Sequence, residues 1–356
     1  MSSTSEKSST SQSFLSAQTI VMAGIVWAVL SLLFFLLFSV PPKGQDLPFW
    51  YVIGTYVFEL GAQLAAALLC LRNWRSPQIV SGRNVWLGIG LGVLSYLIGN
   101  LLFGCWEVVW GLDPDVSLGD VFYIAAYFLL AWGMILAVIS RRLNLEIWQW
   151  AVLAAIAAGG IALAVWVATP TNKITPAGVI NPAATEQVAT SVAPTAKAPK
   201  APAIKPGSKP VAKAPAKPAV TEEAEEAEEA EEAEEATAAP SWVQALDKQL
   251  EPYAYPVNLF YIIGDVFLLI IATALLLAFW GGRFSNSWRM IAAATFSLYI
   301  ADMWFKYAET RIQGEYQSGS LLEVFFVFMG VLFGIGAVLE HDISTRSRRP
   351  GRKQRG

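Results

Sequence analysis

The chain has 356 residues, of which 55% are hydrophobic and only 15% are charged, and its mean hydropathy is +0.47. A soluble domain usually carries about 25% charged residues, so the charges present are too few to cover a globular surface. The two cysteines, Cys70 and Cys105, exclude a disulfide scaffold and a four-cysteine metal site. The single histidine, His341, excludes every multi-histidine metal centre. We therefore expect neither a metal site nor a cofactor.

Eight apolar runs each have about the twenty residues that a helix needs to cross a bilayer. Backbone polar groups inside a bilayer must be hydrogen-bonded internally, so these runs are expected to be helices and not strands. The first run ends at Pro41-Pro42 without a cleavage motif of small residues, which indicates a retained helix rather than a signal peptide. The eight predicted spans are 19–40, 49–71, 84–110, 116–140, 147–168, 257–280, 288–308 and 321–339.

Three further segments lie outside the predicted spans. Residues 1–16 are rich in Ser and Thr and are predicted to be a disordered tail. Residues 169–240 are predicted to be a long disordered linker, with a Pro/Ala/Lys block followed by a coiled-coil-like Glu-Glu-Ala repeat. This linker fits a solvated spacer or an acidic arm for a basic partner. Residues 241–256 are predicted to form a short amphipathic interfacial helix, with Ser241 and Gln244 as a capping box.

The distribution of Lys and Arg predicts the orientation of the chain. With eight spans, fourteen of these residues lie on one side, whereas the short loops on the other side hold only Lys43 and Arg311. The positive-inside rule then places both termini in the cytoplasm and residues 169–256 outside it. The basic tail 341–356 is expected to contact anionic lipid rather than nucleic acid.

The two halves of the sequence resemble each other. Four spans per copy is an even number, so both copies would have the same orientation in the membrane. We therefore predict an all-α integral membrane fold of two parallel four-helix repeats. Residues 17–168 hold the first repeat and the first span of the second, which residues 257–340 complete. The aligned stretches are Asn100–Glu107 with Asp302–Glu309, 117–122 with 320–325, Gly133 with Gly336, and 51–54 with 261–264.

Charged residues inside the apolar spans are the candidate functional residues, because a charge at the centre of a membrane helix costs about 2.5–3.5 kcal/mol. Glu59 and Asp265 lie deepest in their spans. Asp302 and Lys306 form an i, i+4 acid–base pair, and Glu309 follows three residues after Lys306. Such residues indicate a cation or polar-ligand site or a proton relay, and those near span ends also fit interfacial helix caps. The ligand- or ion-binding candidates are Glu59, Glu107, Asp265, Asp302, Lys306 and Glu309, while Asp120 and Glu323 are repeat-equivalent acidic helix starts.

Enzyme motifs are absent from the sequence. Gly119-Asp120 and Gly264-Asp265 each place an aspartate after glycine, as intramembrane aspartyl proteases do, but without the full Gly-x-Gly-Asp and Pro-Ala-Leu motifs. The sequence also has no Gly-rich phosphate loop, nucleophile elbow or His-containing dyad. We therefore predict a protein that is not an enzyme, with a membrane protease as the least favoured class.

Two motif regions, roughly 85–140 and 288–340, carry a family resemblance. The motifs are Asp302-x-x-Phe-x-Tyr-x-Glu309 with Gly314-x-Tyr316-x-x-Gly319-Ser320-x-x-Glu323, and Pro114-x-x-Ser117-x-x-Asp120-x-x-Tyr123. They resemble a multi-pass membrane module of prokaryotes that often stands before a diguanylate cyclase, phosphodiesterase or histidine-kinase domain as sensor input. Glu323 stands where that pattern has Asp, and no output domain follows in residues 341–356.

The resemblance implies a sensor-type module. Taken with the missing enzyme motifs, we predict a non-enzymatic sensor-like or scaffolding module in a prokaryotic cell membrane or internal membrane, acting through its acidic residues near the outer span ends and its long linker. Its expected contacts are the lipid bilayer and another membrane or signalling protein, through which it would act. The alternative is a secondary transporter, because parallel repeats and intramembrane carboxylates are also transporter traits.

Overall fold

The computed structural model describes residues 16–41, 47–112, 116–140, 145–169, 239–279, 285–311 and 318–346. These residues are mostly helical, and no strand occurs among them. The predicted disordered tail up to residue 15, the predicted linker from 170 to 238 and the basic tail from 347 lie outside the described residues. So do Pro114, Gly314 and Tyr316 of the resemblance motifs.

Each of the eight predicted spans corresponds to a long helix. Among the described residues, seven helical segments are long and apolar enough to cross a membrane. The remaining helix, α10, is 27 residues long but more polar, because it carries Asp302, Lys306 and Glu309 among other charges. The part of the chain that the structure describes is therefore all-helical, as predicted, with the long apolar helices of a multi-pass membrane protein. The helices are α1 (Ala17–Phe38), α2 (Phe49–Arg75), α3 (Arg83–Gly104), α4 (Gly119–Ser140), α5 (Ile147–Ala168), α9 (Ala254–Ala278), α10 (Ser285–Arg311) and α11 (Val324–Arg346).

Local sequence explains several of the helix starts. The side chain of Ser16 accepts a hydrogen bond from the Thr19 amide (3.1 Å) and caps α1. Glu146 and Gln149 form a reciprocal capping box at the start of α5. Gly82, with φ of 101°, makes the turn into α3, a backbone conformation that a residue with a Cβ rarely adopts.

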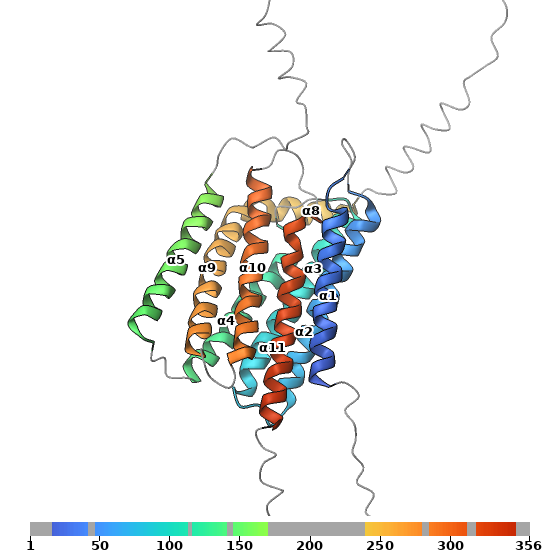
Figure 1. The fold of residues 1–356 in the computed structure, drawn as a ribbon. Coiled ribbons are helices and arrows are strands. Elements are labelled where there is room, and N and C mark those ends of the chain that lie inside the picture. The colour runs from blue at the N-terminus through green and yellow to red at the C-terminus, as the bar shows by residue number, and fades with distance from the viewer. Residues whose placement is uncertain are drawn as a thin grey trace, which may run out of the picture.

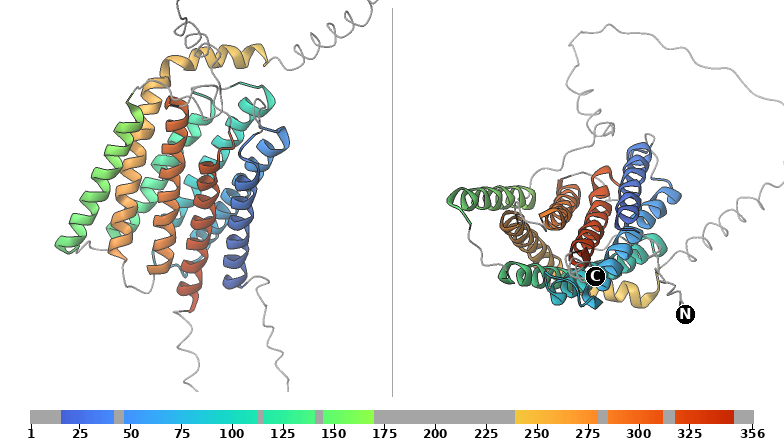
Figure 2. Two further views of the ribbon diagram at one scale, coloured as in Figure 1. Left: turned by 45° about the horizontal axis from the view of Figure 1, so that its top comes forward. Right: turned by 60° about the horizontal axis from the view of Figure 1, so that its bottom comes forward.

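Six of the helices form a closed ring. Following contacts around it, α2 packs on α3, α3 on α4, α4 on α9, α9 on α10, α10 on α11, and α11 returns to α2. The remaining two long helices lie outside this ring (Figures 1 and 2). The helix α1 packs on α11 and α2, whereas α5 packs on α9 and α10. The ring therefore combines three helices from each half of the sequence.

The helix directions place the two described ends of the chain together. The start of α1 and the end of α11 lie at one end of the bundle, and the short helix α8 (Ser241–Leu250) lies across the other (Figure 1). The turn between Arg75, which ends α2, and Arg83, which begins α3, lies at the α1-start end, whereas Arg311 ends α10 at the α8 end.

The helix α8 forms where a short amphipathic helix was predicted, but its predicted cap is wrong. Pro240 occupies the N-cap position without a side-chain cap, and the Gln244 side chain donates to the carbonyl of Ala239 (2.8 Å). Val243 is fully buried against Trp106, which fixes α8 on the end of α3. A single 3₁₀ turn, Glu251–Tyr253, then leads directly into α9.

The half of the ring away from α8 is packed with side chains. Trp86 of α3, Trp288 of α10 and Phe333 of α11 are all fully buried there. Phe279, just after α9, stacks on Trp288 with ring centroids 4.6 Å apart. The helices α3 and α4 come close enough at Gly88 and Gly133 that a methyl group on Gly88 would lie 2.7 Å from the Gly133 Cα. Small residues let the helices approach closely, and the large ones close this half of the ring.

Candidate functional site

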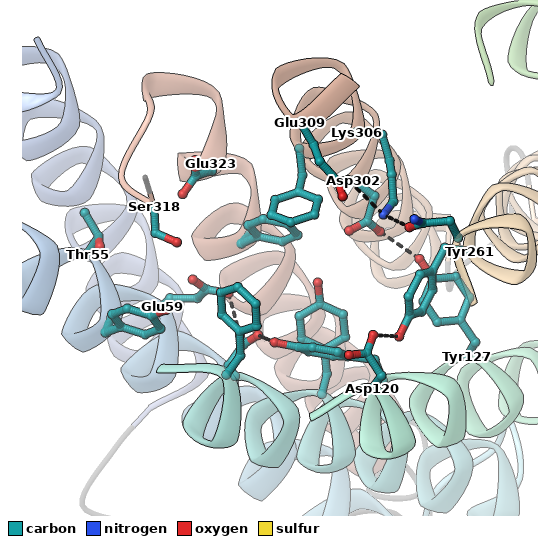
Figure 3. Close-up of a pocket in the computed structure, with 18 of the residues that line it drawn as sticks. Thr55, Glu59, Asp120, Tyr127, Tyr261, Asp302, Lys306, Glu309, Ser318 and Glu323 are labelled. Atoms are coloured by element: carbon teal, nitrogen blue, oxygen red, sulfur yellow. Dashed lines mark hydrogen bonds and ion pairs between the residues drawn. The ribbon is translucent and has the colours of Figure 1, made fainter. Parts of the chain in front are cut away.

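A partly open cavity of about 150 Å³ lies in the half of the ring nearer α8. We call it the pocket, and Figure 3 shows side chains from different helices converging on it. All six ring helices contribute to its wall. Its lining is mainly of aromatic and acidic character, with Tyr56, Tyr96, Tyr123, Tyr127, Tyr261, Phe35, Phe103, Phe305 and Phe326 beside Glu59, Asp120, Asp302, Glu309, Glu323, Lys306, Thr55, Asn100, Asn258 and Ser318.

The alternating helix directions explain why these residues meet. The lining residues come from the first halves of α2, α4 and α9 and from the second halves of α3 and α10. On α9, Asn258 and Tyr261 are three residues apart, and on α10 Asp302 and Lys306 are four apart, so each pair faces the same side of its helix. Polar residues at helical spacing therefore form a stripe on each helix that faces the ring interior.

One wall of the pocket is a hydrogen-bonded network around Glu59. Tyr123 donates to the side-chain oxygen of Asn100 (2.5 Å), and Asn100 Nδ2 donates to Glu59 Oε1 (2.5 Å). Gln63, fully buried one turn deeper on α2, also donates to Glu59 Oε1 (3.0 Å). These donors stabilise a carboxylate that would be costly in an apolar environment without partners.

The opposite wall contains two neighbouring carboxylates. The hydroxyl of Tyr127 lies within hydrogen-bond distance of both Asp302 Oδ2 (2.8 Å) and Asp265 Oδ1, so the two carboxylates compete for its single proton. Asp265 is only 2% exposed, and its Oδ2 atom has no hydrogen-bond partner among the described residues. Two carboxylates that share one donor repel each other when both are ionised. This pair therefore attracts a proton or a cationic group.

The two acidic helix starts, Asp120 and Glu323, are capping residues that also line the pocket. Asp120 Oδ2 accepts from the Ser117 amide (2.7 Å), and Asp120 Oδ1 accepts from the Tyr261 hydroxyl (2.6 Å). Glu323 accepts from the Ser320 amide (3.1 Å) and hydroxyl (2.7 Å), and from the Gly319 amide (2.7 Å). Both carboxylates therefore satisfy backbone donors at a helix start while contributing negative charge to the pocket.

Glu107 lies behind the pocket wall, in a π-helical turn, Cys105–Val109, that continues α3. It accepts from the Tyr56 hydroxyl (2.6 Å) and from the Ser318 amide (3.0 Å). Tyr56 and Ser318 both line the pocket, so Glu107 positions two wall residues. Turns of this kind occur often at functional sites, because they turn a helix face by inserting one residue.

Lys306 is the basic residue of the pocket lining, and of its two acidic neighbours on α10 it pairs with Glu309. Its Nζ atom lies 3.3 Å from Glu309 Oε2 and donates to Asn258, while Asp302 accepts from Tyr127. The same ammonium lies 5.7 Å from the Tyr261 ring centroid. The tyrosine on α4 thus competes for Asp302, and Lys306 turns toward α9 instead.

The structure brings most of the sequence-predicted residues to one place. Glu59, Asp120, Asp302, Lys306, Glu309 and Glu323 line the pocket, while Asp265 and Glu107 contact wall tyrosines from behind. Of the five lining tyrosines and the amide side chains of Gln63, Asn100 and Asn258, the sequence marked Tyr123 and Asn100 only as motif and repeat residues and predicted none as a site residue. The sequence feature that could have identified them is helical spacing. Tyr123 and Tyr127 are four residues apart, as are Tyr96 and Asn100, so each pair lies on one face of its helix.

The charge of the pocket limits its chemistry. Five carboxylates and one ammonium line it, and each uncompensated charge at mid-membrane costs about 2.5–3.5 kcal/mol. Protons or a bound cation would relieve this imbalance. Among the described residues, no group of three or more His, Cys, Asp or Glu is arranged to hold a metal ion.

No protein-family model matches this chain, and comparisons with curated proteins and with solved structures also gave no match.

Proposed function

We propose that this protein is a non-enzymatic sensor-like module of the membrane, which binds a small polar ligand in the pocket and acts through a partner protein. One observation carries the proposal: the pocket occupies a single half of the ring, and the other half is closed by fully buried aromatic side chains, among them Trp86 and Trp288. Because the ring is closed below the pocket, this arrangement favours a ligand that binds in the pocket over a substrate that passes through the ring. The resemblance of the 302–323 and 114–123 motifs to sensor input modules favours the same function.

A secondary transporter is the second candidate, because two of the pocket carboxylates, Glu59 and Asp302, lie well inside their helices. Such proteins usually bind substrate between discontinuous helices near the membrane midplane. In the described residues, α2, α4, α9 and α10 pass the pocket without a break, and α3 has only its terminal π-helical turn. A membrane protease is less favoured still, because the carboxylate that shares a donor with Asp265 is Asp302 and not Asp120.

Two parallel repeats are part of this proposal, and helix capping supports them. The alignment pairs Ser117 with Ser320 and Asp120 with Glu323. In both halves the serine amide donates to the carboxylate three residues later, at 2.7 Å before α4 and at 3.1 Å before α11. Equivalent residues therefore make equivalent bonds at the starts of equivalent helices.

Close helix contacts support the repeats independently. A methyl group on Gly133 would lie 2.9 Å from the Val85 carbonyl oxygen, and one on Gly336 would lie 3.2 Å from that of Ser287. Val85 and Ser287 correspond by the offset that pairs Asn100 with Asp302. An experimental structure in which α2–α4 failed to superpose on α9–α11 would contradict the duplication.

We propose an orientation in which the α8 end of the bundle, and with it the pocket, faces away from the cytoplasm. The positive-inside rule supports it, because Arg75, Arg83 and Arg346 lie at the other end. Both termini would then be cytoplasmic, and residues 169–256 would be extracytoplasmic. A cytoplasmic partner that responds to ligand binding in the pocket would contact the end of the bundle where α11 ends.

The test of the proposed function is capture of the partner. The tagged full-length protein is purified in mild detergent from crosslinked native membranes, and bound proteins are identified by mass spectrometry. A signalling enzyme is expected, and its activity should change with Asp302→Asn in the pocket. Asp342→Asn, the same chemical change at the opposite end of the bundle, is the matched control. Purification of the protein alone, or a partner indifferent to Asp302→Asn, would contradict the sensor function.

A further inference from the structure

We infer that the pocket binds a small protonated primary amine with a short aliphatic body. This inference rests on the proposed ligand-binding function and names the chemical class of the ligand. It is carried by four features: the charge of the pocket, its existing ammonium site, a pair of carboxylates at its wall that share one donor, and its size.

The charge of the lining selects a cation. Glu59, Asp302 and Glu309 come from two different helices, and Asp120 and Glu323 cap two more. Lys306 supplies one positive charge against these five carboxylates. An anionic ligand would meet repulsion from nearly every side, whereas a cation would reduce the excess of negative charge in a poorly solvated space.

The pocket already accommodates one ammonium group. The Nζ atom of Lys306 is bound by the side chains of Asn258 and Glu309 and lies 5.2 Å and 5.7 Å from the ring centroids of Phe305 and Tyr261. Ammonium groups are attracted to aromatic faces at such distances. The same kinds of group, carboxylate oxygens and tyrosine faces, line the remainder of the pocket on the Glu59 side. On the Glu59 side of the pocket, the ammonium group of a ligand would therefore meet the same kinds of group that surround the Lys306 ammonium.

A shortage of donors at the Asp302 wall favours a ligand with N–H groups. Asn258, Tyr261 and Asp265 follow one face of α9, so Asp265 lies one turn deeper than the lining residues, behind the wall. Its Oδ1 atom competes with Asp302, which lines the pocket, for the single proton of the Tyr127 hydroxyl. Buried acceptors with too few donors are costly. A primary ammonium can donate three hydrogen bonds, whereas a quaternary ammonium donates none.

The size of the cavity and the nature of its walls limit the body of the ligand. A cavity of about 150 Å³ is the size that holds a benzene molecule in an engineered apolar site. The wall offers aromatic faces such as Tyr96, Tyr123 and Phe326, against which methylene groups pack without needing partners. A four-carbon amine such as butylamine or 1,4-diaminobutane matches this volume and these surfaces.

Equilibrium binding to the purified full-length protein in detergent tests the inference. The probes are butylamine, 1,4-diaminobutane, 1-butanol and butyrate, which share chain length and differ in charge. We expect saturable binding of the amines only, weakened about tenfold or more by Asp302→Asn and by Glu59→Gln, because each removes a charged partner. Asp342→Asn should leave it unchanged, since that residue pairs with Arg346 outside the pocket.

Three results would overturn the inference: equal binding of 1-butanol and butylamine, amine binding unaffected by both pocket variants, or no saturable binding of either amine. The partner assay separates this failure from failure of the proposed function. If Asp302→Asn changes the partner's activity while no amine binds, the sensor function stands and only the ligand class is wrong. If the partner does not respond either, both proposals fail.

Discussion

The hydroxyl of Tyr261 in α9 donates a 2.6 Å hydrogen bond to Asp120 at the start of α4, and so joins the second half of the sequence to the first. Tyr51, which the alignment pairs with Tyr261, makes the reciprocal connection by donating to the Gly319 carbonyl before α11 (2.6 Å). Each half of the sequence thus holds the helix start of the other with a tyrosine, at the end of the ring where the pocket lies.

Tyr261→Phe removes one of these connections without changing the shape of the ring. We expect a loss of about 1–2 kcal/mol in the free energy of unfolding, because the bond has a charged acceptor. Thermal unfolding of the detergent-solubilised protein measures this loss. Tyr253→Phe is the matched control, since that side chain is 58% exposed just before α9. Equal melting temperatures for Tyr261→Phe and the control would show that the tyrosine does not hold the helices together.

Gly133→Ala should be strongly destabilising, because the new methyl group would lie 2.8 Å from the Ile89 backbone nitrogen of α3. Backbone atoms cannot move aside as the end of a side chain can, so α3 and α4 must separate. We expect a loss of about 1–3 kcal/mol or failure to accumulate in the membrane. Gly159→Ala in α5 is the control, since nothing lies within 4 Å of the added atom there. Comparable melting temperatures for the two variants would refute the close contact.

The spans could be predicted because bilayer crossing requires long apolar helices, and their bounds agree with the structure within a few residues at most ends. The exception is α11, which was predicted to end at Leu339 and continues to Arg346. Its last turns are polar in sequence but are held by α2 and the turn after it. Asn73 donates to the Ala337 carbonyl (2.8 Å), and the Val80 amide donates to Ser344 Oγ (3.3 Å). Such contacts join residues more than 260 positions apart and leave no periodic signal.

The acids of the pocket could be predicted because charge is rare in membrane helices, but their donors could not. Tyr56, Tyr123 and Tyr127 are amphipathic residues that fit a lipid interface as well as a pocket, so type alone does not distinguish the two. Their roles depend on the rotation of each helix within the ring. For the same reason the sequence could not decide between Asp302 and Glu309 as the partner of Lys306, whereas in the structure Lys306 pairs with Glu309 and Asp302 accepts from Tyr127.

Asp265→Asn should stabilise the protein, because it removes one of two neighbouring buried carboxylates and keeps the shape of the side chain. We expect a gain of about 1 kcal/mol in thermal unfolding experiments. Tyr127→Phe should have the opposite effect. We expect it to lower the free energy of unfolding by about 2 kcal/mol, since both carboxylates lose their shared donor. If Asp265→Asn destabilises as much as Tyr127→Phe, the pair is held by interactions other than this shared bond.

Cys105 provides a native probe of the proposed orientation. It is exposed in the π-helical turn at the α8 end of α3, whereas Cys70, near the end of α2 at the other end of the bundle, is fully buried. A membrane-impermeant maleimide applied to intact cells should therefore label one cysteine, provided that the α8 end faces away from the cytoplasm. Labelling should disappear in Cys105→Ser and persist in Cys70→Ser.

Inverted membrane vesicles give the complementary measurement, because their cytoplasmic face is outside. There we expect labelling of Cys105 only after the vesicles are opened with detergent. Labelling of Cys105 in closed inverted vesicles, together with protection in intact cells, would reverse the orientation. The pocket end of the bundle would then face the cytoplasm, and the amine ligand would have to be an intracellular one.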